Sequence, residues 1–186
     1  MKNKAVFLDR DNTLIEDKGF VHNISDINWL SGAKRGIEYF SRRGFKLIVI
    51  TNQSGVAKGY FGEDEINYFH DHMNNELVTQ NEISIDKFYY CPHHPDGKIT
   101  KYTKKCNCRK PGDDLFKRAI NEMSINPVHS IAIGDRPSDL IPAFNNGVKR
   151  GYLVDKQGNH SDFLKSILFD VQVDIIKNWE NILDTI

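Results

Sequence analysis

The sequence has no net charge, no long hydrophobic run and little cysteine, and each of these absences excludes a class of protein. Its 25 basic side chains are balanced by 25 acidic ones, which argues against a general nucleic-acid or membrane-surface binder. No apolar run approaches the roughly 20 residues that a membrane-spanning helix needs. The first four residues lead directly into an apolar run, so we expect no signal peptide, no membrane partner and a cytoplasmic location.

The few cysteines are clustered. Cys91, Cys106 and Cys108 lie close together in the chain, and an odd, clustered set indicates a metal site rather than a disulfide framework. With His93 they form a Cys3His set, which is typical of structural Zn2+. His94 is a competing ligand, the one-residue spacing within each pair is unusual, and three free thiols are the alternative. Four protein ligands leave no open position, so we expect a structural zinc that pins the loop 91–108.

The chain alternates short apolar runs with segments of helical periodicity over its 186 residues. We expect strands at residues 5–9, 45–51, 87–90, 130–134 and 151–154. We expect helices at 32–43, 63–80, 113–123 and 138–146, with a final strand and helix within 172–186. The spacing of Ile66, Phe69 and Met73 is typical of the buried face of a helix. This alternation predicts a single Rossmann-like α/β/α domain over residues 1–186, with a mainly parallel central sheet between two helical layers.

Ligands of such sheets bind beyond the carboxyl ends of the strands. A short segment that includes Asp17, Gly19 and Phe20 connects the first strand to the first helix. A separate cap domain would need more chain, so we expect a site that is open and shaped by loops. This segment is a candidate substrate contact, and a plain surface turn around Gly19 is the alternative that the sequence alone favours.

Two carboxylates follow the first predicted strand. Asp9 and Asp11 are two residues apart, and such side chains point to the same face of an extended backbone. Two like charges held together repel one another, and Mg2+, which prefers oxygen ligands, removes that conflict. We therefore expect Mg2+ here, with one carboxylate as nucleophile and metal ligand and the other as general acid and base. An Asx-rich turn is the alternative.

Polar donors follow the second predicted strand. Thr51, Asn52, Gln53 and Ser54 offer hydroxyl and amide groups that suit phosphate oxygens. The next residue, Gly55, lets backbone amides approach a ligand closely. A polar helix cap is the alternative interpretation.

Two cations follow the last cysteine. Arg109 presents a bidentate fork to phosphate, and Lys110 supplies a compact point charge. The zinc loop would hold both of them at a fixed location.

The run Asp9-Arg10-Asp11-Asn12-Thr13 after an N-terminal strand resembles the first motif of the haloacid dehalogenase superfamily of phosphohydrolases. The resemblance implies that Asp9 attacks phosphate to form an aspartyl-phosphate intermediate. It also implies that Asp11 protonates the leaving group and then activates water. The family usually has glycine at the position of Asn12, and asparagine tolerates a left-handed backbone better than most other residues.

Three further motifs of the superfamily follow in order. The second and third imply that Thr51 binds the transferred phosphoryl group and that Lys110 neutralises its charge. The fourth implies that Asp135 completes the Mg2+ site with Asp9 and Asp11.

Two residues of the fourth motif and one of the zinc loop have less defined roles. The resemblance places Arg136 near the substrate, and Arg109 near the sugar or a distal phosphate. Asp139 is a water-mediated metal contact, a group that orients its neighbours, or an acid in the first turn of a helix.

Within the superfamily, the zinc loop and the missing cap resemble the group of histidinol-phosphate and heptose-bisphosphate phosphatases. Residues 19–22, 51–55 and 90–95 are most similar to the heptose-bisphosphate members, although Phe20 replaces the usual tyrosine and Arg136 the usual lysine. The resemblance implies a phosphatase that acts on a small phosphorylated sugar and supplies heptose for surface polysaccharide, and we expect a monomer. Histidinol phosphate, a polynucleotide 3′-phosphate, or a catalytically silent phosphate-binding protein remain as alternatives.

Overall fold

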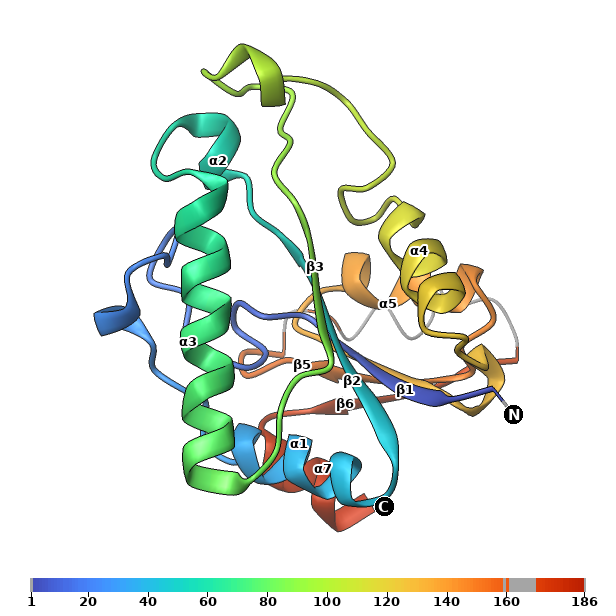
Figure 1. Cartoon of the computed structure of the whole chain (residues 1–186). Helices are drawn as coiled ribbons and strands as arrows, with labels where there is room; N and C mark the ends of the chain where they lie inside the picture. Colours follow the sequence, from blue (N-terminus) through green and yellow to red (C-terminus); the bar gives the residue numbers. More distant parts are fainter. Residues whose placement is uncertain (1, 159, 161–169, 186) are drawn as a thin grey trace.

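A computed structural model describes residues 2–158, 160 and 170–185 of the chain. Its sheet has six parallel strands in the order β3-β2-β1-β4-β5-β6 (Figure 1). The strands are β1 (Lys4–Leu8), β2 (Phe45–Asn52), β3 (Lys87–Cys91), β4 (Ile131–Gly134), β5 (Arg150–Val154) and β6 (Gln172–Ile176). Each predicted strand is confirmed to within a residue or two, including the one expected near the C-terminus.

The helices also follow the sequence prediction closely. They are α1 (Ala33–Arg42), α2 (Gly55–Lys58), α3 (Glu63–Asn81), α4 (Asp114–Glu122), α5 (Pro137–Asn145) and α7 (Trp179–Thr185). Short 3-10 turns lie at η1 (Ile24–Asp26), η2 (Thr100–Tyr102) and η3 (Pro127–His129). The four-residue α2 was not predicted, because one turn is too short to show helical periodicity.

The side chains of each central strand alternate between two hydrophobic cores, as the pleat of a strand requires. Val6 and Leu8 of β1 join the core beneath α1, α3 and α7. Ala5 and Phe7 join the core beneath α4 and α5. The structure therefore confirms the predicted three-layer α/β/α architecture.

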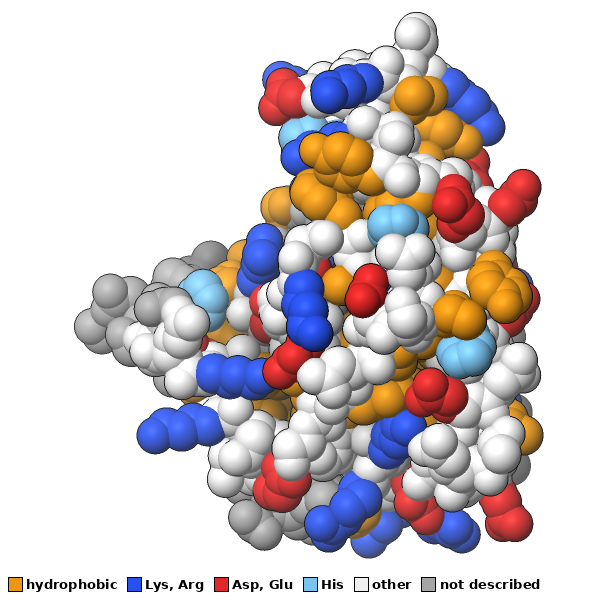
Figure 2. Space-filling model, turned by 90° about the vertical axis from the view of Figure 1, so that its left-hand side faces the viewer, with side chains coloured by type: hydrophobic (Ala, Val, Ile, Leu, Met, Phe, Trp, Pro, Cys, Tyr) orange, Lys and Arg blue, Asp and Glu red, His pale blue; other side chains and the backbone are white. Residues whose placement is uncertain are grey.

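The connection from β1 to α1 contains only loops and η1, and within the described ranges no separate cap covers the carboxyl edge of the sheet. On the face drawn in Figure 2, charged side chains of both signs are interspersed and hydrophobic side chains gather in the upper part. No helix of the described chain is both long and apolar enough to cross a membrane.

The strand order decides where the chemistry lies. Because β1 lies between β2 and β4, the carboxyl ends of these three strands are neighbours. Asp9 follows β1, Thr51 is near the end of β2, and Asp135 follows β4. The sheet therefore brings together residues that are far apart in the chain.

Candidate active site

A cavity of about 270 Å³ lies at this edge of the sheet. It is lined by every residue predicted to act in catalysis, Mg2+ binding or substrate binding: Asp9, Asp11, Asp17, Gly19, Phe20, Thr51, Asn52, Gln53, Ser54, Arg109, Lys110, Asp135 and Arg136. Asn12, Ser138 and Asp139 line it as well. The first of these three stands out in the sequence only as a departure from the motif, and Ser138 gives no recognisable signal.

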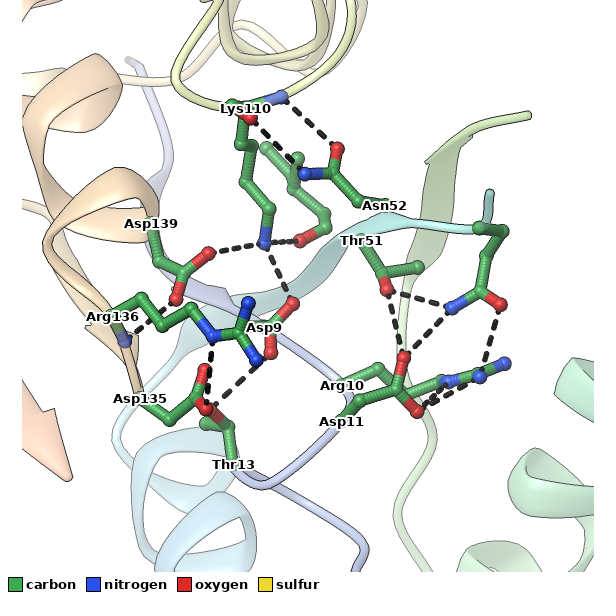
Figure 3. A network of polar contacts seen from close by, with 12 residues as sticks. Asp9, Arg10, Asp11, Thr13, Thr51, Asn52, Lys110, Asp135, Arg136 and Asp139 are labelled. Carbon is green, nitrogen blue, oxygen red and sulfur yellow. Dashed lines mark hydrogen bonds and ion pairs between the residues drawn. The ribbon is translucent and has the colours of Figure 1, made fainter. Parts of the chain in front are cut away.

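The Lys110 ammonium lies at the centre of a buried polar cluster (Figure 3). Its Nζ donates to Oδ1 of Asp9 at 2.6 Å and to the carbonyl oxygen of Ile50 at 2.6 Å. Oδ1 of Asp139 is 2.8 Å away. Of the functions left open for Asp139, the structure shows two. Its carboxylate orients Lys110, and it is an acid in the first turn of α5, where its Oδ2 accepts from the N–H of Arg136 at 2.9 Å.

Burial and charge shift the acid–base equilibria of this cluster. Burial would lower the pKa of Lys110, but the carboxylates of Asp139 and Asp9 outweigh it and raise the pKa above its ordinary value. Burial raises the pKa of Asp9 well above its ordinary value, Lys110 opposes this shift, and the other carboxylates nearby add to it. The cluster therefore has more negative charge than one lysine neutralises, which favours a bound cation.

The structure offers three carboxylates for that cation. Ligand oxygens of Asp9, Asp135 and Asp139 lie within 4.8 Å of one another. Burial, and next the Asp139 carboxylate, raise the pKa of Asp135 to about 7, and its cationic neighbour is the exposed Arg136 at 3.6 Å. Hard oxygen donors and excess negative charge fit Mg2+.

Asp11, predicted as a third side-chain ligand, has other partners. Its Oδ1 accepts from Nε of Arg10 at 2.9 Å, and its Oδ2 accepts from Nε2 of Gln53 at 2.9 Å. Oγ1 of Thr51 lies 3.5 Å from the same Oδ2. The structure thus groups Asp139 with the candidate Mg2+ ligands, and direct Mg2+ coordination by the Asp11 carboxylate stays a prediction.

Asn52 clamps the main chain of Lys110 from the end of β2. The Asn52 amide donates to the Lys110 carbonyl oxygen at 3.1 Å, and its side-chain oxygen accepts from the Lys110 N–H at 3.0 Å (Figure 3). Asn52 was predicted to contact substrate, and it lines the cavity. Its hydrogen bonds show that it holds the main chain of Lys110, and its contact with substrate stays a prediction.

The backbone around the motifs explains two residue choices. Asn12 has a φ of 57°, so the left-handed conformation anticipated from the sequence is present. Its Oδ1 accepts from the N–H of Asp17 at 3.1 Å, which ties the predicted substrate segment around Asp17, Gly19 and Phe20 to the turn of the first motif. A Cβ at Gly134 would lie 2.3 Å from the Cβ of Asp139, so only glycine allows the fourth motif to close.

The four predicted zinc ligands converge. The sulfur of Cys108 lies 3.0 Å from that of Cys91 and 3.2 Å from that of Cys106, and Nδ1 of His93 lies 3.1 Å from the Cys108 sulfur. All four ligand atoms lie within 4.8 Å of one another, which suits one four-coordinate Zn2+. Burial and the neighbouring thiols raise the pKa of Cys91, so a metal ion would be needed to keep it as a thiolate.

Arg109 follows the zinc ligands and lines the cavity. Its Nη1 is buried and has no hydrogen-bond partner among the described residues. A buried guanidinium nitrogen without a partner is costly, and an anionic ligand in the cavity would satisfy it.

Comparison with known proteins supports a phosphatase site. The model of the family described as polynucleotide kinase 3 phosphatase matches residues 4–167. A D-glycero-beta-D-manno-heptose-1,7-bisphosphate 7-phosphatase of Haemophilus ducreyi is 41% identical over 154 residues, 83% of this chain and 84% of the relative. The protein of the same name from Haemophilus influenzae is 41% identical over 152 residues, which cover 82% of this chain and 82% of the relative.

A solved structure supports the same relationship. The D,D-heptose 1,7-bisphosphate phosphatase of B. bronchiseptica, complexed with magnesium and phosphate, has a TM-score of 0.79 and 26% identity. The match covers 98% of this chain and 99% of the other.

Proposed function

Because this chain belongs to the polynucleotide kinase 3 phosphatase family, together with the heptose-1,7-bisphosphate 7-phosphatases, we propose that it hydrolyses the C7 phosphate of D-glycero-D-manno-heptose 1,7-bisphosphate. The product, heptose 1-phosphate, would supply surface polysaccharide synthesis. The observation that carries the proposal is the buried Asp9–Lys110–Asp139 cluster beside Asp135, within a chain so similar to these enzymes.

The first step forms a phosphoenzyme. A carboxylate oxygen of Asp9 attacks phosphorus, a bond forms between them, and the bond from phosphorus to the C7 oxygen breaks. Lys110 and Thr51 provide positive charge and a hydroxyl donor for the phosphoryl oxygens. Asp11 gives its proton to the departing C7 oxygen.

The second step releases phosphate. A water molecule attacks phosphorus while Asp11 takes one of its protons, and the bond between phosphorus and Asp9 breaks. Inorganic phosphate leaves, Asp9 is regenerated, and Asp11 is protonated again for the next cycle.

Mg2+ fits the carboxylates at this site. When bound, it would neutralise phosphoryl oxygens and the charge of the transition state. Asp9 and Asp135 would hold it, with Asp139 or Asp11 nearby. The Cys3His set would hold Zn2+ as a structural ion that fixes the loop carrying Arg109 and Lys110.

The remaining polar groups suit the rest of a bisphosphate. Arg109 has a buried nitrogen without a hydrogen-bond partner in the described part of the chain, and Arg136 is exposed at the rim of the cavity. Both are arginines, which bind phosphate oxygens in bidentate geometry. One reacting phosphate does not need them, so we assign them to the C1 phosphate and the sugar, with the segment that includes Asp17, Gly19 and Phe20.

A polynucleotide 3′-phosphatase is the second candidate, because the matched family carries that description. A nucleic-acid substrate needs a basic track for its phosphates. Zero net charge and the mixed face of Figure 2 favour the small sugar substrate instead.

A substrate panel tests the proposal. Purified protein with Mg2+ is given both anomers of heptose 1,7-bisphosphate, histidinol phosphate and a 3′-phosphorylated oligonucleotide, and kcat/KM is measured by phosphate release. The proposal predicts the highest kcat/KM for a heptose bisphosphate. A higher value for histidinol phosphate or the oligonucleotide would replace it.

A further inference from the structure

Arg10 is a buried cation to which the proposed mechanism assigns no role. It lies between the two aspartates of the first motif, and 1% of its surface is exposed. Its guanidinium lies over the Phe69 ring of α3, 4.7 Å from the ring centre. A charge in such surroundings requires several partners, and their identity indicates its task.

The guanidinium contacts four parts of the site. Nε and Nη2 approach the same oxygen of Asp11 at 2.9 and 2.8 Å. Nη2 also donates to the side-chain oxygen of Gln53 at 3.1 Å and to the carbonyl oxygen of Val21 at 2.9 Å. Nη1 lies 3.3 Å from Nε2 of His70 on α3.

His70 is suited to accept that last hydrogen bond. Its ring stacks on Phe88 of β3, with centres 4.3 Å apart and planes 12° apart. Burial, and next the charge of Arg10, lower the pKa of His70 well below its ordinary value. The imidazole is therefore neutral, and its Nε2 is the acceptor that fixes the guanidinium plane.

Together these contacts hold both oxygens of the Asp11 carboxylate. Arg10 donates to Oδ1 of Asp11, and Gln53 donates to Oδ2. The side-chain oxygen of Gln53 in turn accepts from Arg10. The same guanidinium is bonded to Val21, next to Phe20 of the substrate segment. We infer that Arg10, oriented by His70, is a positioning residue that fixes the Asp11 carboxylate for proton transfer and ties it to the substrate segment.

This inference rests on the proposed function and makes a chemical distinction. The proton from Asp11 matters most when the leaving group is a poor one, such as the alkoxide of a sugar. A p-nitrophenolate leaves with little help. A misplaced Asp11 should therefore slow cleavage of an alkyl phosphate far more than cleavage of p-nitrophenyl phosphate, whereas general damage to the site should slow both equally.

Three variants and a control distinguish the positioning of Asp11 from a general effect on folding. Arg10→Met removes every donor and keeps an unbranched apolar chain. His70→Leu removes only the acceptor, and His70→Gln restores one. Asn74→Ala is the matched control, because Asn74 lies one turn further along α3 and its side chain bonds the backbone of Ile85 at 2.7 and 3.2 Å without contacting Arg10.

The measurement is kcat/KM for a primary sugar monophosphate and for p-nitrophenyl phosphate, with thermal melting as a check of folding. For Arg10→Met we expect about a 10- to 100-fold loss on the sugar phosphate and less than about threefold on the aryl ester. His70→Leu should show the same selective loss to a smaller extent, and His70→Gln should restore most of the lost kcat/KM on the sugar phosphate. Asn74→Ala should leave the ratio of the two kcat/KM values unchanged.

Two outcomes would overturn the inference. Equal losses on both esters in a folded Arg10→Met or His70→Leu protein would assign the pair a purely structural role. Unchanged kinetics in both would show that Asp11 needs no such support. A wild-type protein that fails to hydrolyse heptose 1,7-bisphosphate would instead refute the proposed function, on which the inference rests.

Discussion

The clamp on Lys110 yields a prediction whose size follows from the structure. Asn52→Ala removes two neutral hydrogen bonds, of 3.1 and 3.0 Å, from the main chain of Lys110. Each such bond contributes about 0.5–1.5 kcal/mol, so the lysine loses about 1–3 kcal/mol of positional restraint. If the restraint is used in the transition state, kcat/KM falls by about 5- to 150-fold.

The assay compares heptose 1,7-bisphosphate with p-nitrophenyl phosphate. Lys110 serves the phosphoryl group common to both, so both values of kcat/KM should fall by the same factor. Asn146→Ala is the control, because it also removes two side-chain contacts, to Asp113 at 3.1 Å and Pro142 at 2.7 Å, away from Lys110. If Asn52→Ala stays within about twofold of wild type while folded, the clamp does not position the lysine.

Three further predictions address the zinc loop, the distal phosphate and a buried histidine. Cys108→Ser should remove zinc, measured by elemental analysis, and lower kcat/KM about 10- to 100-fold on both substrates because Lys110 moves; zinc loss with unchanged kinetics would contradict this. Arg109→Ala should cost about 10- to 150-fold on the bisphosphate and far less on p-nitrophenyl phosphate; equal losses would assign it to the reacting phosphate. Burial and the charge of Arg10 lower the pKa of His70 from 6.5 in the folded protein. Below that pH the imidazole therefore takes up a proton only in the unfolded chain. As the pH falls, wild type should lose stability relative to His70→Gln by up to about 1.4 kcal/mol per pH unit. Urea unfolding at about pH 7.5 and about pH 5.5 checks it, and a pH-independent difference would mean that folding leaves the pKa of His70 unchanged.

The fold was predictable from the sequence because its signals are local. Apolar runs such as β2 end at polar residues, and helical spacing marks α1, α3 and α4. Because the carboxyl ends of parallel strands lie at one edge of a sheet, Asp9, Thr51 and Asp135 could be predicted to lie together, and they line one cavity. The four candidate zinc ligands could also be predicted from the sequence, because three cysteines and a histidine clustered in one short loop are typical of a metal site.

The partners of these residues could not be predicted in the same way. Asn52 reaches Lys110 across 58 positions, and Arg10 reaches His70 across 60. Such pairs depend on how helices and loops pack over the sheet, which no local pattern records. Likewise, Trp179 of α7 donates to the carbonyl oxygen of Thr13 in the catalytic turn at 2.7 Å, although the sequence suggested only a helix that completes the core.

The most direct test of the proposed reaction follows heptose 1,7-bisphosphate by phosphorus-31 NMR in the presence of Mg2+, with wild type and Asp9→Asn. An amide is neither a nucleophile for phosphorus nor an anionic ligand, and Asp9 lies at a strand end where the change should leave the fold intact. We expect wild type to release the C7 phosphate and keep the C1 phosphate, while a folded Asp9→Asn releases none. Release of the C1 phosphate, or near-normal turnover by Asp9→Asn, would contradict the proposed mechanism.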